Sequence, residues 1–554
     1  MSARPFAWER SYPPTLNWGM PIATCTLPTL LDEAVARFAD RAALEFNERR
    51  ISYRELGARV AAAAAGFAAL GVGPGVQVAL YLPNTPFHPI AFFGALRAGG
   101  RCVHLSPLDP LRALRFKLED SAARILVTVD VPGLLANALQ LLAQGAIDHL
   151  IVGEQHEFGA GTAGERLPAA ARAFSHFHEA AAPAQWPPID QEDVALLQYT
   201  GGTTGLPKGA MLTHANLSAA VSMYHAWHEA TRADADTSDR VICVLPLFHI
   251  YALTTILLCG IHRGAEILLR PRFDVEALLA DIEGKRATAF PGVPTMWIAL
   301  NAHPGVDKRD LSSLRTVSSG GAPLPTEVAE RLERLTGHRL AGGWGMTETA
   351  PAGTRLLPGQ ANAPGLIGVP LPGIEMQVVA VGDPHRLLQT RETGEIRVRG
   401  PNVTRGYWRR PQQSAAAYAD GFFLTGDIGY MDENGCFYLV ERKDDMIISG
   451  GFNVYPTVIE RAIYEHTAVE EVIVIGIADA YRGQSAKAFI KLRAGAAAFT
   501  LDELRAFLED KLGRHELPAA LEYRERLPKT PVGKLWRRGL IEELQTPYAP
   551  ATAG

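Results

Sequence analysis

Strand-like and helical hydrophobic patterns alternate over the first two thirds of the chain. Residues 29–70 carry the pattern of a helix, a short hairpin and a second helix that ends at Leu70-Gly71. Strands that alternate with helices are typical of parallel sheets with helices on both faces, so we predict an α/β fold. The predicted buried strands are 76–82, 125–129, 149–152, 194–199, 240–245, 266–269, 288–291 and 314–318.

Two segments depart from this alternation. Residues 153–190, rich in Ala, Gly, Pro and His, predict a surface excursion before the strand at 194–199. After Gly365 the strands become short and turn-rich, which predicts a small β subdomain. Its predicted strands are 375–380, 394–398 and 437–440.

Beyond Arg442 the pattern predicts a compact α+β module of ordinary domain size. Its predicted elements are a helix at 458–465, strands at 471–477 and 486–492, and a helix at 501–512 with Thr500 as its N-cap. We therefore divide the chain into a large N-terminal domain, 1–441, which includes the β subdomain at about 365–441, and a C-terminal domain, 442–554.

Composition narrows the class of protein. The chain has 554 residues, of which 47% are hydrophobic and 20% charged, as in soluble globular proteins. Its net charge of −5 provides no basic field for nucleic acid, and its five scattered cysteines predict free thiols in a reducing compartment. No signal peptide is evident, and the apolar stretch at 250–261 is too short to span a bilayer. We expect a cytoplasmic protein and leave peripheral membrane contact open.

The segment YTGGTTGLPKGA, residues 199–210, has the chemistry of a phosphate-binding loop. Glycines free backbone N–H groups to face an anion, threonine hydroxyls add donors, and Lys208 adds a positive charge. The common P-loop is excluded, because there the lysine follows glycine directly and precedes Ser or Thr.

Three further motifs accompany this loop: GWGMTET at 343–349, TGD at 425–427 followed by ERKDD at 441–445, and PKTPVGK at 528–534. In this order and spacing, the four resemble the adenylate-forming superfamily of acyl-CoA synthetases, luciferases and nonribosomal adenylation domains. The resemblance covers about residues 27–540. LPLFHI and GGFNVYP, at 245–250 and 450–456, are most similar to the fatty acyl-CoA ligases.

The resemblance implies a site for ATP and Mg²⁺. Glu348 and Thr200 are expected to bind the metal, and Thr347 to contact the α-phosphate. Trp344, where the family usually has tyrosine, would present an aromatic ring to adenine. Asp427 would accept hydrogen bonds from the ribose hydroxyls. The phosphate-binding residues implied are Thr200, Gly201, Gly202, Thr203, Thr204 and Lys208, and the other nucleotide- and CoA-binding residues are Gly321, Ala322, Gly343, Trp344, Asp427, Arg442, Gly450 and Gly451.

Two residues near the C-terminus complete the implied machinery. Lys534 would orient the acid and offset charge at the α-phosphate, although an ordinary surface lysine is the alternative. An exposed Gly-Lys pair is also a target for a lysine acetyltransferase, whose product would lose the charge. Asp444 aligns with the hinge about which a mobile C-terminal domain would rotate, bringing Gly450-Gly451 to the thioester site; a charged turn of no special role is the alternative.

The acid would lie beside His249, for which a satisfied core histidine is the alternative, in a pocket formed by glycines and apolar residues. His225 and His228, three apart on a predicted helix, indicate a solvated face rather than a metal site. Arg355, or a residue from the region 225–240, could reach the pocket, so chain length and acceptance of dicarboxylic acids stay open. The substrate-binding residues implied are Phe248, Val293, Gly320 and Met346.

We therefore expect an acid–thiol ligase that converts a medium- or long-chain fatty acid, ATP and coenzyme A through acyl-AMP to acyl-CoA, AMP and pyrophosphate. Alternatives are an adenylating ligase that serves a carrier protein, an aryl or dicarboxylic acid–CoA ligase, and a catalytically inactive binding protein. The retention of Lys208, Glu348, Asp427 and Lys534 argues against the last. A homodimer is also considered.

Overall fold

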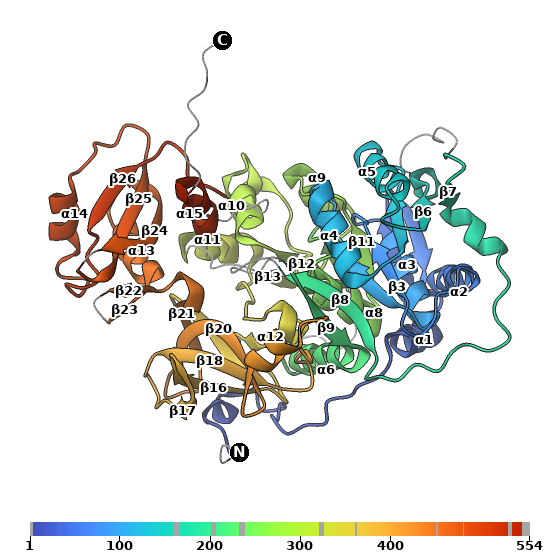
Figure 1. The fold of residues 1–554 in the computed structure, drawn as a ribbon, viewed down its shortest axis with the longest axis horizontal. Coiled ribbons are helices and arrows are strands. Elements are labelled where there is room, and N and C mark those ends of the chain that lie inside the picture. Colours follow the sequence, from blue (N-terminus) through green and yellow to red (C-terminus); the bar gives the residue numbers. More distant parts are fainter. Residues whose placement is uncertain are drawn as a thin grey trace, which may run out of the picture.

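The computed structural model describes residues 4–159, 167–200, 207–231, 239–320, 326–360, 363–449, 452–479, 481–529 and 535–545, to which all structural statements below refer. Four sheets and the helices around them form this part of the chain (Figure 1). The predicted α/β fold with a β subdomain and a separate C-terminal domain is confirmed.

A seven-stranded sheet has the order β7-β6-β5-β3-β4-β8-β9. All neighbours are parallel except β8 and β9, which form an antiparallel hairpin. Its strands are β3 (Gln77–Leu80), β4 (Arg101–His104), β5 (Ile125–Val129), β6 (His149–Gly153), β7 (Ala171–Ala173), β8 (Val194–Thr200) and β9 (Lys208–Thr213). The predicted surface excursion thus contributes β7, with the short helices η2 (Gln155–Phe158) and η3 (Phe174–Glu179), to the body of the protein.

A six-stranded sheet has the order β13-β12-β10-β11-β1-β2, and it is parallel except at β1–β2. Its strands are β1 (Ala42–Phe46), β2 (Arg49–Ser52), β10 (Arg240–Cys243), β11 (Glu266–Leu269), β12 (Ala289–Gly292) and β13 (Thr316–Ser319). Ligand sites form at the carboxyl ends of such parallel strands.

Helices cover both sheets, and α3 is buried along nearly its whole length. The helices of this region are α1 (Leu27–Phe38), α2 (Tyr53–Ala69), α3 (Phe87–Arg97), α4 (Leu111–Ser121), α5 (Pro132–Ala143), α6 (His214–Thr231), α7 (Ile250–Ala252), α8 (Cys259–Arg263), α9 (Val275–Gly284), α10 (Pro294–Ala302) and α11 (Thr326–Thr336). A π-helical turn, η4 (Leu253–Leu258), joins α7 to α8. No helix in the described ranges is both long and apolar enough to cross a bilayer.

The β subdomain is an antiparallel sheet that starts earlier than predicted, at β14 rather than after Gly365. The reason is that β14 follows the GWGMTET segment and pairs with β15. Its strands are β14 (Thr354–Arg355), β15 (Leu366–Pro370), β16 (Glu375–Ala380), β17 (Asp383–Leu387), β18 (Gly394–Arg399), β19 (Tyr418–Ala419), β20 (Phe422–Met431) and β21 (Phe437–Arg442), with helix α12 (Pro411–Ala416) beside them.

The C-terminal domain has its own sheet and its own apolar core (Figure 1, orange and red). Thr500 caps α14 as predicted, but the helix ends at Leu508 because the charged residues at 509–511 do not continue its apolar face. The elements are β22 (Ile447–Ser449), β23 (Phe452–Val454), α13 (Pro456–Tyr464), β24 (Val469–Asp479), β25 (Gly483–Leu492), α14 (Leu501–Leu508), β26 (Ala520–Tyr523) and α15 (Arg537–Gln545).

Candidate active site

The β8–β9 hairpin carries the predicted phosphate loop. Thr200 and Lys208 are cross-strand partners at its open end, and the Thr200 hydroxyl donates to the Lys208 carbonyl at 3.5 Å. The residues between them, including the predicted Gly201, Gly202, Thr203 and Thr204, lie outside the described ranges. The hairpin therefore holds both ends of the loop.

Lys208 and Glu348 are brought together through Tyr407. The Lys208 Nζ lies 5.2 Å from the centre of the Tyr407 ring, and the Tyr407 hydroxyl donates to Glu348 Oε1 at 2.8 Å. Glu348 is only 5% exposed; burial raises its pKa, while the Tyr407 hydrogen bond opposes the rise. The arrangement holds a carboxylate and a cation beside the phosphate loop.

Backbone contacts lock Tyr407 in this position. Trp408 N donates to Gly209 O at 2.8 Å, and Thr404 N donates to Glu348 O at 2.7 Å. Sequence reasoning missed Tyr407, because no spacing or charge pattern distinguishes it. The backbone around it is unusual, with φ at 122° in Gly406 and 53° in Arg409.

Tyr407→Phe should lower kcat/KM for ATP about tenfold, because the buried Glu348 loses a hydroxyl donor. Titration of activity against Mg²⁺ should show a higher requirement for the metal. The matched control is Tyr430→Phe, which removes a hydroxyl from β20 outside the site. An unchanged Mg²⁺ dependence in Tyr407→Phe would contradict a role for this contact.

Trp344, Asp427 and Arg442 form a second cluster. The Trp344 indole donates to Asp427 Oδ2 at 2.8 Å, and Arg442 Nη1 donates to Asp427 Oδ1 at 2.6 Å. Burial opposes charge on Arg442, but Asp427 outweighs it and raises the pKa of the guanidinium. Trp344, which stands where the family usually has tyrosine, therefore orients the carboxylate of Asp427, the predicted ribose-binding residue, through its indole N–H.

The glycines of GWGMTET are required by close backbone packing. A Cβ on Gly343 would lie 2.1 Å from Thr354 O, and one on Gly345 would lie 1.5 Å from Pro351 O. Thr347 and Glu348 open the short helix η6 (Thr347–Thr349), which places Thr347 half-buried next to the buried carboxylate. The same segment half-buries Met346, whose N–H donates to Thr349 Oγ1 at 3.1 Å.

A buried amide network holds the segment that contains Phe248 and His249. Asn84, 3% exposed, accepts from Leu247 N at 2.8 Å and donates to Leu245 O at 2.9 Å. Gln198 donates to Phe248 O at 3.0 Å. These fixed contacts from two strand ends set the position of the predicted acid-binding residues.

His249 is the N-cap of α7, where its Nδ1 accepts from Tyr251 N at 3.3 Å. The residue is exposed at the surface, while the protein atoms around its imidazole lower the pKa by desolvation. A largely neutral imidazole open to solvent is able to accept a proton or a hydrogen bond at neutral pH.

Asn84→Leu should lower the free energy of unfolding by about 2 kcal/mol, because it strands buried backbone groups around Leu245 and Leu247. It should also raise KM for the acid more than KM for ATP. Thermal unfolding and steady-state kinetics measure the two effects. Asn137→Leu, which removes a single amide contact on α5, is the control, and equal changes in both KM values would contradict the expected local effect.

Two of the predicted acyl-binding residues, Val293 and Gly320, directly follow β12 and β13. Gly320 N donates to Gly292 O at 3.2 Å, and Val293 follows as the half-buried N-cap of α10. A Cβ on Gly320 would lie 2.9 Å from the Tyr251 ring, so the glycine admits that ring beside the strand end. Gly321 and Ala322 lie outside the described residues.

Ion pairs surround the predicted hinge. Lys443 donates to Glu395 at 2.6 Å, and Asp444 itself is exposed. On the far side, Arg537 of α15 donates to Glu441 at 3.2 Å and to Asp445 at 2.7 Å. A half-buried cation therefore joins the last strand of the β subdomain to the C-terminal helix.

Three predicted residues of the C-terminal domain, Gly450, Gly451 and Lys534, lie outside the described ranges. The ends of the Lys534 segment are placed: Lys529 and Leu535 form an isolated antiparallel bridge, and Trp536 N donates to Pro528 O at 2.8 Å.

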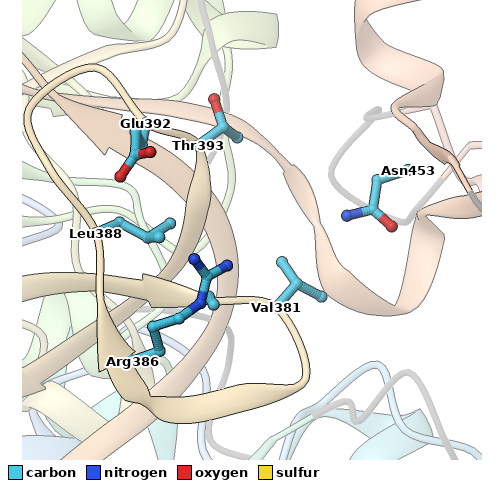
Figure 2. A pocket seen from close by; sticks show the side chains of 7 residues that line it. Val381, Arg386, Leu388, Glu392, Thr393 and Asn453 are labelled. Carbon is cyan, nitrogen blue, oxygen red and sulfur yellow. The ribbon is translucent and has the colours of Figure 1, made fainter.

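A separate recess of about 380 Å³ lies between β23 and the edge of the β subdomain that is formed by β17 and the loop following it. Figure 2 shows Asn453 facing Val381 and Arg386 across it. None of the predicted site residues lines this recess, so it lies apart from the two clusters described above. Its lining is Ala380, Val381, Arg386, Leu388, Glu392, Thr393 and Asn453.

Few of the described residues could bind a metal ion. Within the described ranges, no group of three or more His, Cys, Asp or Glu side chains could hold an ion. His225 and His228 are half-buried rather than solvated as predicted, because His225 packs against His262 at 4.7 Å between ring centres. Glu348 fits Mg²⁺, which needs one or two protein carboxylates when substrate phosphates and water supply the other ligands.

Comparison with known proteins identifies the family of the chain. Residues 31–408 match the model of the AMP-binding enzyme family, and residues 458–534 match the C-terminal domain of AMP-binding enzymes. The chain therefore belongs to the AMP-binding enzyme family.

Relatives within the family are similar over nearly their whole length. A long-chain-fatty-acid–CoA ligase of Bacillus subtilis is 37% identical, covering 97% of this chain and 98% of the relative. A feruloyl-CoA synthase of Amycolatopsis is 36% identical over 88% and 92% of the two chains. The ATP-bound crystal structure of MatB from Rhodopseudomonas palustris superposes with a TM-score of 0.82 at 28% identity, covering 94% of this chain and 99% of that one.

Proposed function

We propose that this protein is an ATP-dependent acid–CoA ligase that activates a medium- or long-chain fatty acid. The observation that carries the proposal is the pair of clusters beside the phosphate hairpin: Lys208 with Glu348, and Asp427 with Trp344. The similarity to long-chain-fatty-acid–CoA ligases supports the choice of acid.

In the first half-reaction, a carboxylate oxygen of the acid attacks the α-phosphorus of ATP and pyrophosphate leaves. The phosphate loop, with Thr200, Gly201, Gly202, Thr203, Thr204 and Lys208, would hold the leaving group. Glu348 with Thr200 would hold Mg²⁺, which when bound neutralises phosphate charge. Thr347 would contact the α-phosphate, where preorganised donors stabilise the transition state.

The nucleoside would lie against Trp344, with the ribose at Asp427 and Arg442, and Gly321, Ala322 and Gly343 beside it. The acid would lie beside His249, in a pocket formed by Phe248, Val293, Gly320 and Met346. Lys534 would then bridge the carboxylate and the α-phosphate, orienting the two reactants for attack.

In the second half-reaction, the thiol sulfur of coenzyme A attacks the acyl carbonyl and AMP leaves. Rotation of the domain 442–554 about Asp444 would withdraw Lys534 and bring Gly450 and Gly451 to the thioester site. Separate positions of one domain allow two reactions to share one site.

Pyrophosphate release with a panel of fatty, aromatic and dicarboxylic acids, with and without coenzyme A, tests the proposal. We expect acid-dependent release with fatty acids, and acyl-CoA only when coenzyme A is present. Absence of release with every acid would contradict it. An aromatic acid is the second candidate, favoured by the similarity to feruloyl-CoA synthase, and the same panel ranks the two.

Three further assignments belong to this proposal: a cytoplasmic location, a homodimer, and acetylation of Lys534 by a lysine acetyltransferase. Acetylation would remove the charge that the first half-reaction needs. Lys534→Gln, which mimics the acetylated side chain, should therefore lose acyl-AMP formation, as measured by pyrophosphate release. Full activity in that variant would remove the basis for this regulation.

A further inference from the structure

Arg355, on the edge strand β14, forms no ion pair with any carboxylate of the described residues. Its side chain is half-buried, its Nε is fully buried without a hydrogen-bond partner, and no hydrogen bond or ion pair to a described residue involves its guanidinium. Taking a guanidinium out of water without pairing it is unfavourable. The position therefore calls for a partner that the described part of the chain does not supply.

Other arginines with a buried, unpartnered Nε differ from Arg355 in this respect. Arg97, Arg263 and Arg537 each pair with a carboxylate through their terminal nitrogens, to Asp32, Asp239 and Glu441 respectively. Arg101 and Arg461 are also half-buried and have no hydrogen bond or ion pair to a described residue, but their Nε atoms are not buried and unpartnered as that of Arg355 is.

The surroundings of Arg355 are aromatic and apolar. Its guanidinium lies 5.0 Å from the centre of the Tyr224 ring on α6, a cation–π contact. It also acts on the buried thiol of Cys259 at the start of α8: burial raises the pKa of Cys259 to about 11, and Arg355 opposes the rise. Arg355 therefore lies against α6 and near the start of α8, two elements that pack together.

Neighbouring side chains lead from Arg355 to the proposed acid site. The Tyr224 hydroxyl, whose pKa is raised by burial, is near enough to Tyr251 for electrostatic interaction. Tyr251 in turn lies against Gly320 and follows His249 by two residues. The helix changes to π geometry directly after α7, a distortion frequent at functional sites.

We propose that Arg355 binds a second carboxylate, at the distal part of the acid, so that the enzyme prefers dicarboxylic acids of the length that reaches it. A planar guanidinium recognises a carboxylate through two parallel hydrogen bonds, and the Tyr224 ring lies 5.0 Å from the guanidinium. This inference rests on the proposed acid–CoA ligase function and names its substrate more narrowly. The first carboxylate would react beside His249 while the second stays bound.

The test compares kcat/KM for dicarboxylic and monocarboxylic acids of equal length, across a series of lengths. In the wild type we expect the dicarboxylic acid to be preferred at one length. Arg355→Met, which keeps the length but removes the charge, should lower the ratio of the two values at least about tenfold. The same variant should keep or raise kcat/KM for the monocarboxylic acids, because it removes a positive charge from apolar surroundings.

Arg112→Met, on the exposed face of α4, is the matched control and should leave the ratio unchanged. If Arg355→Met folds poorly, Arg355→Lys keeps the charge without the fork and should give an intermediate ratio. Thermal unfolding of the wild type with each acid should show the larger rise with the preferred dicarboxylic acid.

Turnover of both acid types with a ratio that Arg355→Met does not change would overturn the inference and leave the ligase function intact. An equal loss for both types would likewise overturn it, because it would indicate a purely structural cation. Absence of turnover with every acid in the wild type would contradict the proposed function instead.

Discussion

Lys534→Ala is expected to slow acyl-AMP formation by at least about a hundredfold, the cost typical of removing one preorganised donor from a developing negative charge. Thiolysis of preformed acyl-AMP by coenzyme A should continue near its normal rate, since Lys534 would be withdrawn in that step. Single-turnover measurements of each half-reaction separate the two effects.

Lys529→Ala is the matched control, because Lys529 lies in the same motif and pairs with Glu471 at 2.6 Å. It should leave both half-reactions nearly unchanged. Lys534→Arg should recover little activity, because a planar fork does not replace a compact ammonium. Equal loss of both half-reactions in Lys534→Ala would contradict a role confined to adenylation.

Arg537→Met is expected to destabilise the C-terminal domain by about 3 kcal/mol or more, because it leaves buried carboxylates without their cation. Arg537 is 15% exposed and pairs with Glu441, Asp445 and Glu460. The free energy of unfolding, measured in denaturant at neutral pH, gives the size of the loss.

The loss should shrink as the pH falls. Burial raises the pKa values of Glu460 and Asp445, and Arg537 opposes both rises. Without Arg537 these pKa values rise further above those of the unfolded chain, so the variant regains stability when the carboxyls take up protons and loses it as pH rises through their folded pKa values. A deficit that is constant between neutral and mildly acidic pH would contradict this account.

Arg538→Met provides the control, since Arg538 is its neighbour and pairs with Glu542 on the surface of α15 at 2.8 Å. An exposed pair of this kind contributes little to stability. We expect the free energy of unfolding of this variant to lie within a few tenths of a kcal/mol of the wild-type value.

Local patterns carried the prediction of the fold. Strands β11 and β16 have the predicted bounds, because runs of apolar residues and turn residues mark both ends in the sequence. β14 was missed because two residues carry no periodicity, and it pairs with β15 across an intervening loop. The end of α14 was placed too late because helix ends depend on tertiary packing as well as on pattern.

Site residues could be predicted from the sequence only where they belong to a contiguous motif. Glu348 and Asp427 belong to contiguous motifs, and their clusters confirm that these motifs lie together. Tyr407 was missed because its partner Glu348 is 59 residues away. Arg537 was missed for the same reason, since Glu441 is 96 residues away; such contacts come from the tertiary fold and leave no local pattern.

The most direct test of adenylate formation follows the oxygen of the acid. A fatty acid labelled with ¹⁸O in both carboxylate oxygens is incubated with ATP, Mg²⁺ and coenzyme A, and the nucleotide product is weighed by mass spectrometry. Attack of the carboxylate on the α-phosphorus, followed by loss of AMP to the thiol, leaves one labelled oxygen in AMP. Our account predicts singly labelled AMP together with unlabelled pyrophosphate. Unlabelled AMP, or ADP with labelled phosphate, would contradict it.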